Sequence, residues 1–373
     1  MINLNIFRLL LILVLSYLSD RANGRINFKG VDEKLKQLNK PAVRTIQMKP
    51  SFKLKEEKLG TTSLSSKLVV SQTWQKSGSC PDGTVPIRRI QRKDLLRAKS
   101  INRFGRKPQE IVSKSNTTYL KKGLYPSNNT TQVALPTIVN RSAAFLVTLG
   151  YNYIGAKGDI NVWNPNVAAD DEFTTAQIWL KAGPADNFES LETGWTKDSY
   201  KSTGCFDLTC SGFVHTNPQV ALGAAIEPVS SGFGQQYHVT LGVYMDPQTS
   251  NWWLKFGADV PIGYWPAGSL MFYLNHSSTL VEWGGQVYST NVKKTPHTKT
   301  AMGSGRFASG LYGNACFIQN PNIVDFSLSL KYPEWVGTWA DEYYCYTAYN
   351  YQKSYGTLPV FYFGGPGQNP NCR

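Results

Sequence analysis

The stretch YHVTLGVYMDPQTSNWWLKF, residues 237–256, decides the fold. In Tyr237–Tyr244 and in Trp252–Phe256, apolar and aromatic side chains recur at every second position, which is the period of a β-strand. Asp246-Pro247 stands between the two runs, and such a pair is typical of turns. The stretch therefore predicts two short strands separated by a turn.

The same pattern continues on both sides of this stretch, from Ala134 to the C-terminus. Clusters of Gly, Pro, Asn and Asp interrupt it at fairly regular intervals, and few segments keep a helical period. Many short strands with frequent turns indicate an all-β fold, either an antiparallel sandwich or a barrel. The further predicted strands are Ala144–Tyr153, Thr175–Leu180, Val281–Tyr288 and Val324–Leu330, and the two predicted helices are Asp32–Leu38 and Arg92–Lys99.

The composition divides the chain into two parts. Of the 373 residues 13% are aromatic and 17% charged, which excludes a largely disordered chain and a coiled coil. Residues 25–130 hold 24 Lys and Arg against 7 Asp and Glu, whereas residues 131–373 hold 13 against 17, together with nine of the ten Trp. We therefore predict a basic pro-segment, the front (residues 25–130), joined to a weakly acidic, aromatic β-sandwich, the body (residues 131–373).

The first 24 residues have the layout of a secretory signal peptide. One Arg precedes the apolar run LLLILVLSYL, residues 9–18, and Ala22-Asn23-Gly24 supplies small residues for signal peptidase. The run is too short for a membrane anchor, and no later apolar run reaches the roughly 18 residues that a bilayer span needs. We predict a secreted, extracellular protein without a membrane partner, with the cell wall and the vacuole as alternative destinations.

An oxidising compartment agrees with the even number of Cys and with the glycosylation sequons. Cys205 and Cys210 enclose only Phe-Asp-Leu-Thr and are predicted to pair, and Cys345 with Cys372 is a second candidate pair. Cys316 is a candidate buried thiol, and no partner is assigned to Cys80. The Asn-X-Ser/Thr sequons are Asn116, Asn128, Asn129, Asn140 and Asn275.

Common catalytic motifs are missing from the sequence. The four His show no His-Glu-x-x-His spacing, no Cys or His pattern suggests zinc, and Gly-x-Ser-x-Gly, Asp-Thr-Gly and nucleotide-binding loops do not occur. No cofactor is therefore expected. The basic front could bind nucleic acid, but a secreted chain meets little of it, so we expect no nucleic-acid partner and a front that lies against the net-negative body.

Carboxylates in aromatic, strand-like segments are the remaining candidates for chemistry. Glu192 lies in SLETGW, residues 190–195, and Glu282 lies in VEWGGQV, residues 281–287. A carboxylate is costly to bury beside Trp, so each is either exposed on a strand or functional. Because side chains alternate along a strand, Glu282 and Gln286 share one face and Trp283 takes the other.

Short motifs rich in Gly and Trp run through the body. They are GDINVWNP (158–165), QIW (177–179), ETGW (192–195), TGC (203–205), CSGFV (210–214), NWWL (251–254), GYWP (263–266), WGG (283–285), MGSG (302–305) and FGGPG (363–367). In this order they resemble the neprosin family of plant glutamic peptidases, over essentially all of residues 134–372. Residues 38–43 (LNKPAV) and 80–89 (CPDGTVPIRR) are similar to the activation peptide of that family.

The resemblance implies a sandwich of two antiparallel sheets, with two glutamates facing each other in a cleft on one sheet. It implies an acid-active endopeptidase, with cleavage after proline as in the founding member, and a front that acts as an intramolecular inhibitor. One family glutamate falls on Glu192, and the other follows Trp-Gly-Gly, a position that Gln286 occupies here. The resemblance therefore makes Glu192 and Gln286 the predicted catalytic residues.

A pair of carboxyl groups suits peptide hydrolysis. One acts as general base on a water and returns the proton to the leaving amine, and the other donates a hydrogen bond to the oxyanion. Two neighbouring carboxyls share a proton, which enforces an acidic optimum. A Gln can donate without a shared proton, as in the similar fungal glutamic peptidases. We predict a monomeric, secreted acid endopeptidase, made as a zymogen, that acts on peptide or protein substrates containing proline.

Two alternatives stay open. The stretch after Trp195, residues 196–202, is shorter than in the family and Gln286 replaces a glutamate, so one alternative is a catalytically degenerate binding or inhibitor protein. The other is a sandwich that binds or hydrolyses wall glycans with Glu192 and Glu282 as its two carboxylates.

Overall fold

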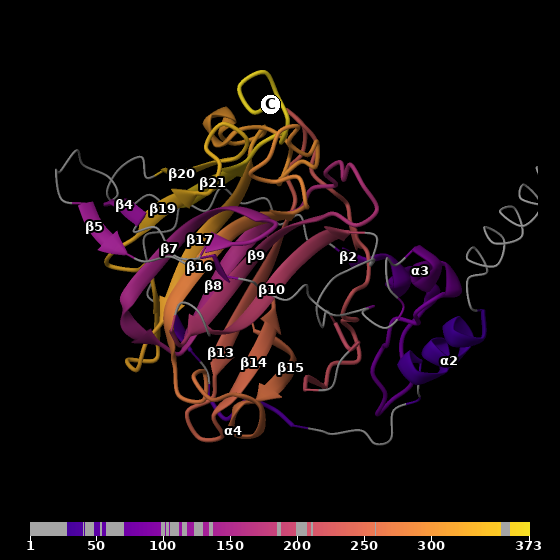
Figure 1. The fold of residues 1–373 in the computed structure, drawn as a ribbon. Helices are drawn as coiled ribbons and strands as arrows, with labels where there is room; N and C mark the ends of the chain where they lie inside the picture. The colour runs from indigo at the N-terminus through magenta and orange to yellow at the C-terminus, as the bar shows by residue number, and fades with distance from the viewer. Residues whose placement is uncertain are drawn as a thin grey trace, which may run out of the picture.

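Two packed β-sheets form the body, and segments of the front join or flank them (Figure 1). The structure is a computed structural model. It describes residues 28–373 except 40, 42–47, 53, 57–70, 98–100, 102–103, 105–111, 114–117, 123–129, 134–136, 185–187, 199–206, 210–211, 258 and 352–358. Strands pair antiparallel throughout the described residues, apart from one parallel pair at a sheet edge, so the predicted all-β sandwich is confirmed.

The larger sheet has ten strands. Its order is β1-β18-β17-β8-β13-β14-β15-β11, and β21 joins it through β17 and carries β20 on its other side. Its strands are β1 (Lys55–Glu56), β8 (Gly155–Asn161), β11 (Val214–His215), β13 (His238–Met245), β14 (Asn251–Phe256), β15 (Val260–Pro266), β17 (Cys316–Val324), β18 (Ser329–Lys331), β20 (Thr347–Tyr351) and β21 (Val360–Gly364).

The smaller sheet has seven strands in the order β10-β9-β16-β7-β19-β4-β5. They are β4 (Thr118–Lys122), β5 (Thr130–Val133), β7 (Arg141–Tyr153), β9 (Phe173–Ala182), β10 (Glu189–Asp198), β16 (Ser278–Tyr288) and β19 (Gly337–Ala340). Two strand pairs lie outside both sheets: β2 (Ser71–Gln72) with β12 (Ile226–Glu227), and β3 (Val112–Ser113) with β6 (Thr137–Ile138). The short helices of the body are α4 (Ala267–Leu270) and η3 (Ala308–Gly310).

The core lies between the two sheets, which meet through the apolar side chains at alternate positions of their strands. Val243 of β13 comes from the larger sheet, and Leu146 of β7, Ile178 of β9 and Trp283 of β16 come from the smaller one; all four are fully buried. The Trp283 indole also donates to the carbonyl oxygen of Lys157 on β8 at 2.9 Å. This hydrogen bond ties the two sheets together.

The predicted strands at β7, β9, β13, β14 and β16 are confirmed. The prediction of one strand over Val324–Leu330 is wrong, because β17 ends at Val324 and β18 begins at Ser329. Asp325 accepts hydrogen bonds from the backbone N–H and the hydroxyl of Ser327, and Leu328 adopts a φ of 60°. These contacts make a turn, so the apolar residues on either side belong to two antiparallel strands.

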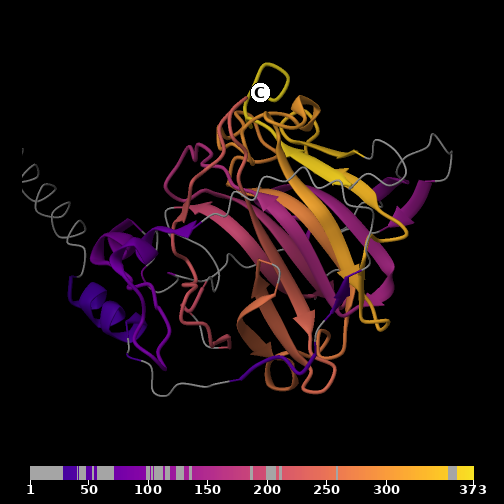
Figure 2. The same cartoon turned by 180° about the vertical axis from the view of Figure 1, so that it is seen from behind.

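The front contains a small helical unit of its own. Both predicted helices are confirmed as α2 (Phe28–Leu38) and α3 (Arg92–Arg97), and they stand to one side of the sandwich in Figures 1 and 2. Val31 of α2 and Leu95 of α3 are fully buried in a cluster with Ile90 and Phe104, apart from the main core. A short 3-10 helix, η1 (Thr73–Ser77), follows β2.

The front is attached to the body by strand pairing. β1 pairs with β18, β2 with β12, and β4 with β19. Ser51 also donates from its backbone N–H and its hydroxyl to the carboxylate of the buried Asp246, at 2.7 and 2.5 Å. Phe52 and Leu54 pack against the main core. The front therefore contributes to both sheets of the sandwich.

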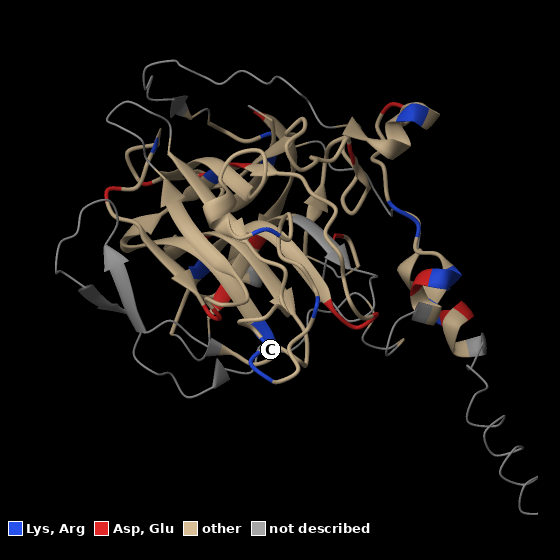
Figure 3. Ribbon diagram, turned by 90° about the horizontal axis from the view of Figure 1, so that it is seen from above, with Lys and Arg blue, Asp and Glu red and all other residues tan. Residues whose placement is uncertain are grey.

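Charge contributes less to this attachment than the net charges of the two parts predict. Figure 3 shows few charged positions along the strands, whereas the helices of the front carry both signs side by side. Between described residues, the ion pair that joins front and body is Lys76 with Glu227. Strand pairing and hydrogen bonds, including those from Ser51 to the Asp246 carboxylate, thus make most of the contacts between front and body among the described residues.

The disulfide between Cys345 and Cys372 is confirmed, with a Cα–Cα distance of 5.3 Å, and it fixes the C-terminal tail. Cys316 is a buried free thiol whose pKa is raised well above its usual value by burial, and Cys80 is free and half-exposed. Cys205 and Cys210 lie outside the described residues, so their pairing stays a prediction.

The glycosylation sequons also stay predictions. Asn140 and Asn275 lie in turns and are half-buried, and the remaining three, at residues 116, 128 and 129, lie outside the described residues. Among the residues that the structure describes, no helix is long and apolar enough to cross a membrane.

Candidate active site

The smaller sheet has one face that points away from the core, and it carries the residues predicted from sequence. Glu192 of β10 lies opposite Trp179 of β9, which in turn lies opposite Glu282 of β16. Directly opposite residues of antiparallel strands point to the same side, so these three side chains share this surface, the outer face. Gln286 belongs to it as well, because it follows Glu282 by an even number of residues.

Glu192 is the half-buried carboxylate of the outer face. Gln177 on β9 donates from Nε2 to one carboxylate oxygen at 2.6 Å, and the Ser190 hydroxyl donates to the other at 2.8 Å. Hydrogen bonds to an ionised group are short and strong, so the two donors fix the orientation of the carboxylate. Its partial exposure leaves it able to take a proton from a water molecule.

Gln177 occupies the centre of the outer face because a glycine stands on each side of it. Gly194 of β10 and Gly284 of β16 are its direct partners in register. A Cβ atom at Gly194 would meet the Ala176 carbonyl oxygen at 2.1 Å, and one at Gly284 would meet the Ala144 carbonyl oxygen at 2.2 Å. The sheet therefore excludes side chains at both positions and leaves room for the Gln177 amide.

Gln286 lies beyond Gln177 on the side away from Glu192, and only 1% of it is exposed. Its direct partner is Thr175 of β9, which is fully buried. Neither Gln286 Oε1 nor Thr175 Oγ1 has a hydrogen-bond partner among the described residues. Buried polar groups are rarely left unpaired, so these atoms mark a place where a water or a substrate group is expected to bind.

The two predicted catalytic residues thus share a face without being directly opposed. Glu192 lies level with Trp179 and Gln286 level with Thr175, on the two strands that flank β9. Gln177 lies between them, so the three polar side chains form a diagonal row across β10, β9 and β16. No role for Gln177 follows from the sequence motifs; the signal that points to it is a long polar residue directly before Ile178 and Trp179 in a strand.

Glu282 has a different environment from Glu192. Its carboxylate accepts from Lys181 Nζ at 2.6 Å, and the two side chains are 3% and 7% exposed. The Lys181 ammonium also lies 5.2 Å from the centre of the Phe188 ring. Glu282 is therefore neutralised by a buried cation, and the bulky Trp179 stands between it and Glu192. This arrangement weighs against a glycosidase pair formed by the two glutamates.

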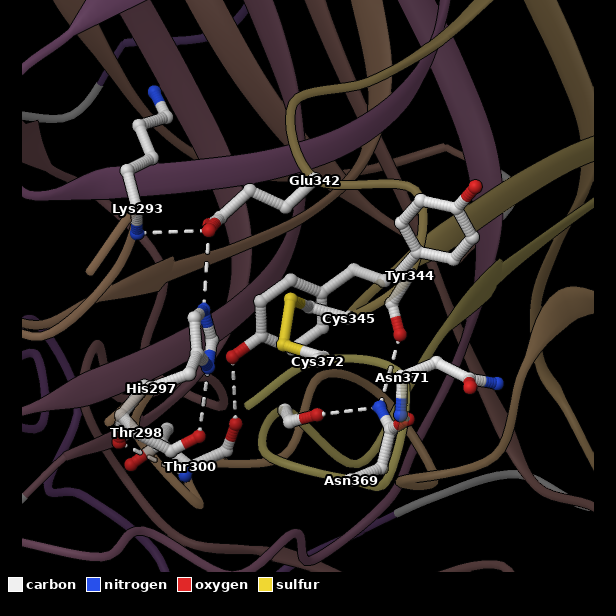
Figure 4. The surroundings of a disulfide bond; sticks show 12 residues. Lys293, His297, Thr298, Thr300, Glu342, Tyr344, Cys345, Asn369, Asn371 and Cys372 are labelled. Carbon is white, nitrogen blue, oxygen red and sulfur yellow. Dashed lines mark hydrogen bonds and ion pairs between the residues drawn. A yellow bond between two sulfur atoms is a disulfide. The ribbon is translucent and has the colours of Figure 1, made fainter. Parts of the chain in front are cut away.

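A second polar cluster surrounds the C-terminal disulfide (Figure 4). His297 lies close to Cys345 and Cys372, but the two sulfurs are bonded to each other and so offer no thiolate to a metal. The imidazole contacts the Thr298 carbonyl oxygen through Nδ1 at 2.8 Å and the Glu342 carboxylate through Nε2 at 3.3 Å. Burial lowers the pKa of His297, but the hydrogen bonds to Glu342 and Thr298 outweigh it, and the net pKa is raised. When His297 is protonated it forms an ion pair with Glu342 beside the disulfide that fixes the tail.

The outer face of this antiparallel sandwich thus carries a half-buried carboxylate in a row of polar side chains, and segments of the front join both sheets. The chain matches the neprosin family model over residues 170–366 and the neprosin activation peptide over residues 36–134. It therefore belongs to the neprosin family, a family of peptidases, and carries that family's activation peptide at its N-terminal side. The boundary between front and body at residues 130 and 131 stays a prediction.

Proposed function

We propose that this protein is a secreted acid endopeptidase of the glutamic type, made as a zymogen and acting on peptides that contain proline. The observation that carries the proposal is the Glu192 carboxylate, held by Gln177 and Ser190 on the same face as the buried amide group of Gln286. Membership of a peptidase family supports the reaction class. The signal-like N-terminus supports secretion.

In this mechanism Glu192 acts first as base and then as acid. It takes a proton from a water whose oxygen attacks the scissile carbonyl carbon, and it then gives that proton to the amide nitrogen as the C–N bond breaks. The Gln286 Nε2–H donates to the oxyanion that forms on the carbonyl oxygen. Gln177 keeps the Glu192 carboxylate in place through its 2.6 Å hydrogen bond.

The pH profile separates the Glu/Gln pair from a pair of glutamates. With Gln286 there is one titrating group, so kcat/KM of the body freed of its front is expected to rise as Glu192 ionises and then to level off, and acid is needed only to release the front. In Gln286→Glu the two carboxyls share a proton, so kcat/KM should pass through an acidic optimum and fall about tenfold for each further pH unit. Rates measured on one peptide from pH 2 to 7 test this.

The same experiment addresses the alternative of a degenerate binding or inhibitor protein, which rests on the replacement of the family glutamate by Gln286. A native protein that cleaves no peptide at any pH, together with a Gln286→Glu variant that gains activity, would support that alternative. Superimposable pH profiles of the two proteins would instead show that Gln286 lies outside the reacting centre.

The zymogen proposal rests on the way the front enters the sandwich. β4, which the activation-peptide match covers, pairs with β19 of the sheet that carries the outer face. In the full chain Gln177 and Gln286 are 4% and 1% exposed, so a peptide cannot reach them without a rearrangement. We therefore assign the front the role of an intramolecular inhibitor whose release opens the outer face.

Asp246 gives the release of the front a pH dependence. Burial raises the pKa of Asp246, but the hydrogen bonds from Ser51 and from the backbone of Gln248 and Thr249 lower it by more, so the net pKa lies below the ordinary value. A lowered pKa means that the attachment favours the ionised carboxylate. The contribution of Asp246 to the attachment of the front is therefore complete near neutrality. It is lost as the pH falls through the pKa that Asp246 has in the attached state.

Asp246→Asn is accordingly expected to weaken the attachment at neutral pH by about tenfold and to reduce its acid sensitivity, because one charged acceptor is lost. The measurement is the fraction of front that stays with the body in gel filtration, after proteolytic cleavage between them, at pH 7 and pH 3. Asp159→Asn is the matched control, since that carboxylate is also buried and accepts hydrogen bonds from the neutral side chains of Thr240 and Asn320, but lies on β8, which pairs with β13 and β17 of the body. Equal retention in all three proteins would contradict the role of Asp246.

A further inference from the structure

Arg141 extends the polar diagonal of the outer face by one more strand. It lies at the start of β7 opposite Tyr288, whereas Gln286 lies opposite its neighbour Ala143. Arg141 and Ala143 are two apart and so point to the same side, which makes Arg141 a diagonal neighbour of Gln286. Long side chains interact across such diagonals. The row therefore reads Glu192, Gln177, Gln286 and Arg141 across four adjacent strands.

The guanidinium of Arg141 is buried without a full set of partners. The residue is 6% exposed, and its Nε and Nη1 have no hydrogen-bond partner among the described residues. Lys181, the other buried cation of the outer face, has the Glu282 carboxylate at 2.6 Å. An uncompensated buried cation is costly, and the planar fork of a guanidinium matches a carboxylate in a two-pronged hydrogen bond.

The neighbours of Arg141 on the outer face are a small residue and a pair of aromatic rings. Ala143 contributes only a methyl group beside it. Tyr288 lies directly opposite on β16, and its ring stacks on that of Phe173 at 5.1 Å with 8° between the planes. The stacked rings form an apolar wall, and a low-dielectric wall strengthens the attraction between a cation and a bound anion.

We infer that Arg141 binds a carboxylate of the peptide substrate, a few residues from the bond that is cleaved. The inference rests on the proposed function, in which the scissile carbonyl lies over β9, between Glu192 and Gln286. β7 is two strands away from β9, about 10 Å, and Arg141 lies level with Phe173, four residues or about 13 Å along the strands from Gln177, so the separation is about 17 Å. An extended peptide advances about 3.3 Å per residue, so a carboxylate at Arg141 belongs to a residue about five positions from the scissile bond, either as a Glu or Asp side chain or as the chain terminus.

Binding to the inactive variant tests this without relying on cleavage. Glu192→Gln protein, freed of its front, is titrated calorimetrically at about pH 5.5, where a Glu side chain is ionised. The ligands are a proline-containing peptide with Gln at every position and a set in which one Gln at a time becomes Glu, each with a free or an amidated C-terminus. One position is expected to bind at least tenfold more tightly as Glu, since a hydrogen bond between charged groups is worth that much.

Variants of Arg141 assign the preference to this residue. In Arg141→Met the affinity for the Glu peptide divided by that for the Gln peptide should fall to about one. Arg141→Lys keeps the charge but not the planar fork, so it should retain part of the preference for Glu. Arg306→Met, which removes an exposed arginine, is the matched control and should leave the ratio as in the parent. If tighter binding follows the free C-terminus instead of a Glu, the bound group is the chain terminus.

Two outcomes would overturn the inference: no peptide carboxylate improves binding, or the preference survives in both Arg141 variants. Thermal unfolding of each variant shows whether it has folded. If Arg141→Met does not fold, the test rests on Arg141→Lys. A preference that depends on Arg141, in a native protein that cleaves none of these peptides, would instead contradict the proposed function and leave the binding site in place.

Discussion

Glu192→Gln is expected to lower kcat/KM for peptide cleavage by about 10²–10⁴-fold, because it removes the group that carries the proton in both steps. Gln has nearly the shape of Glu, and its amide oxygen can still accept from Gln177 or Ser190. The fold and the substrate-binding surface are therefore expected to persist. The measurement is the initial rate of peptide hydrolysis by the acid-released body of each protein.

The matched control for this experiment is Glu334→Gln. Glu334 is an exposed glutamate that accepts a hydrogen bond from the Tyr151 hydroxyl at 2.9 Å, outside the outer face. The substitution changes the net charge by the same amount as Glu192→Gln, so it should keep the native rate. A Glu192→Gln protein as fast as this control would mean that the carboxylate does not take part in catalysis.

Lys181→Met is expected to lower the free energy of unfolding by about 3–5 kcal/mol, since it leaves the buried Glu282 carboxylate without its cation. The ion pair is 2.6 Å long, with neither side chain more than 7% exposed, so water cannot replace the lost partner. Denaturant unfolding of the variant and of the native protein measures the effect.

The double variant Lys181→Met, Glu282→Leu separates the burial of a charge from the loss of packing. Two apolar side chains of similar size need no partner, so most of the lost stability should return. The same protein tests the glycan alternative, because a glycosidase that used Glu192 and Glu282 could not keep its activity without Glu282. A double variant as unstable as Lys181→Met would show that the pair has another structural role.

The sequence alone predicts the sandwich because apolar residues recur with the two-residue period by which a strand turns one face to the core. Strand β13 places Val239, Leu241 and Val243 in the core at alternate positions, so the order of the residues already displays the period of a strand. The face that holds Glu282 and Gln286 is predicted in the same way, by the position of Trp283. The segment Val324–Leu330 is where local pattern fails, because a turn set by Asp325 and Ser327 reverses the chain between two apolar ends.

The sequence alone does not predict most of the residues that make up the candidate site. Gln177, Lys181 and Arg141 acquire their meaning from strand register, which places β9 between β10 and β16 and β7 beyond them. No local signal distinguishes Glu282, bound to a lysine 101 positions away, from the half-exposed Glu192. The attachment of the front is similarly non-local. Net charge suggests an ionic contact, whereas β1, β2 and β4 are held by strand pairing.

The most direct test of the central claim is to map the bonds that the protein cleaves. The full chain is cleaved between front and body, acidified to release the front, and incubated at about pH 3 and pH 5 with a library of peptides that contain proline, and the products are identified by mass spectrometry. The account predicts cuts at proline by the native protein and none above background by Glu192→Gln. A library left intact by the released native protein, or cut equally by both proteins, would contradict it.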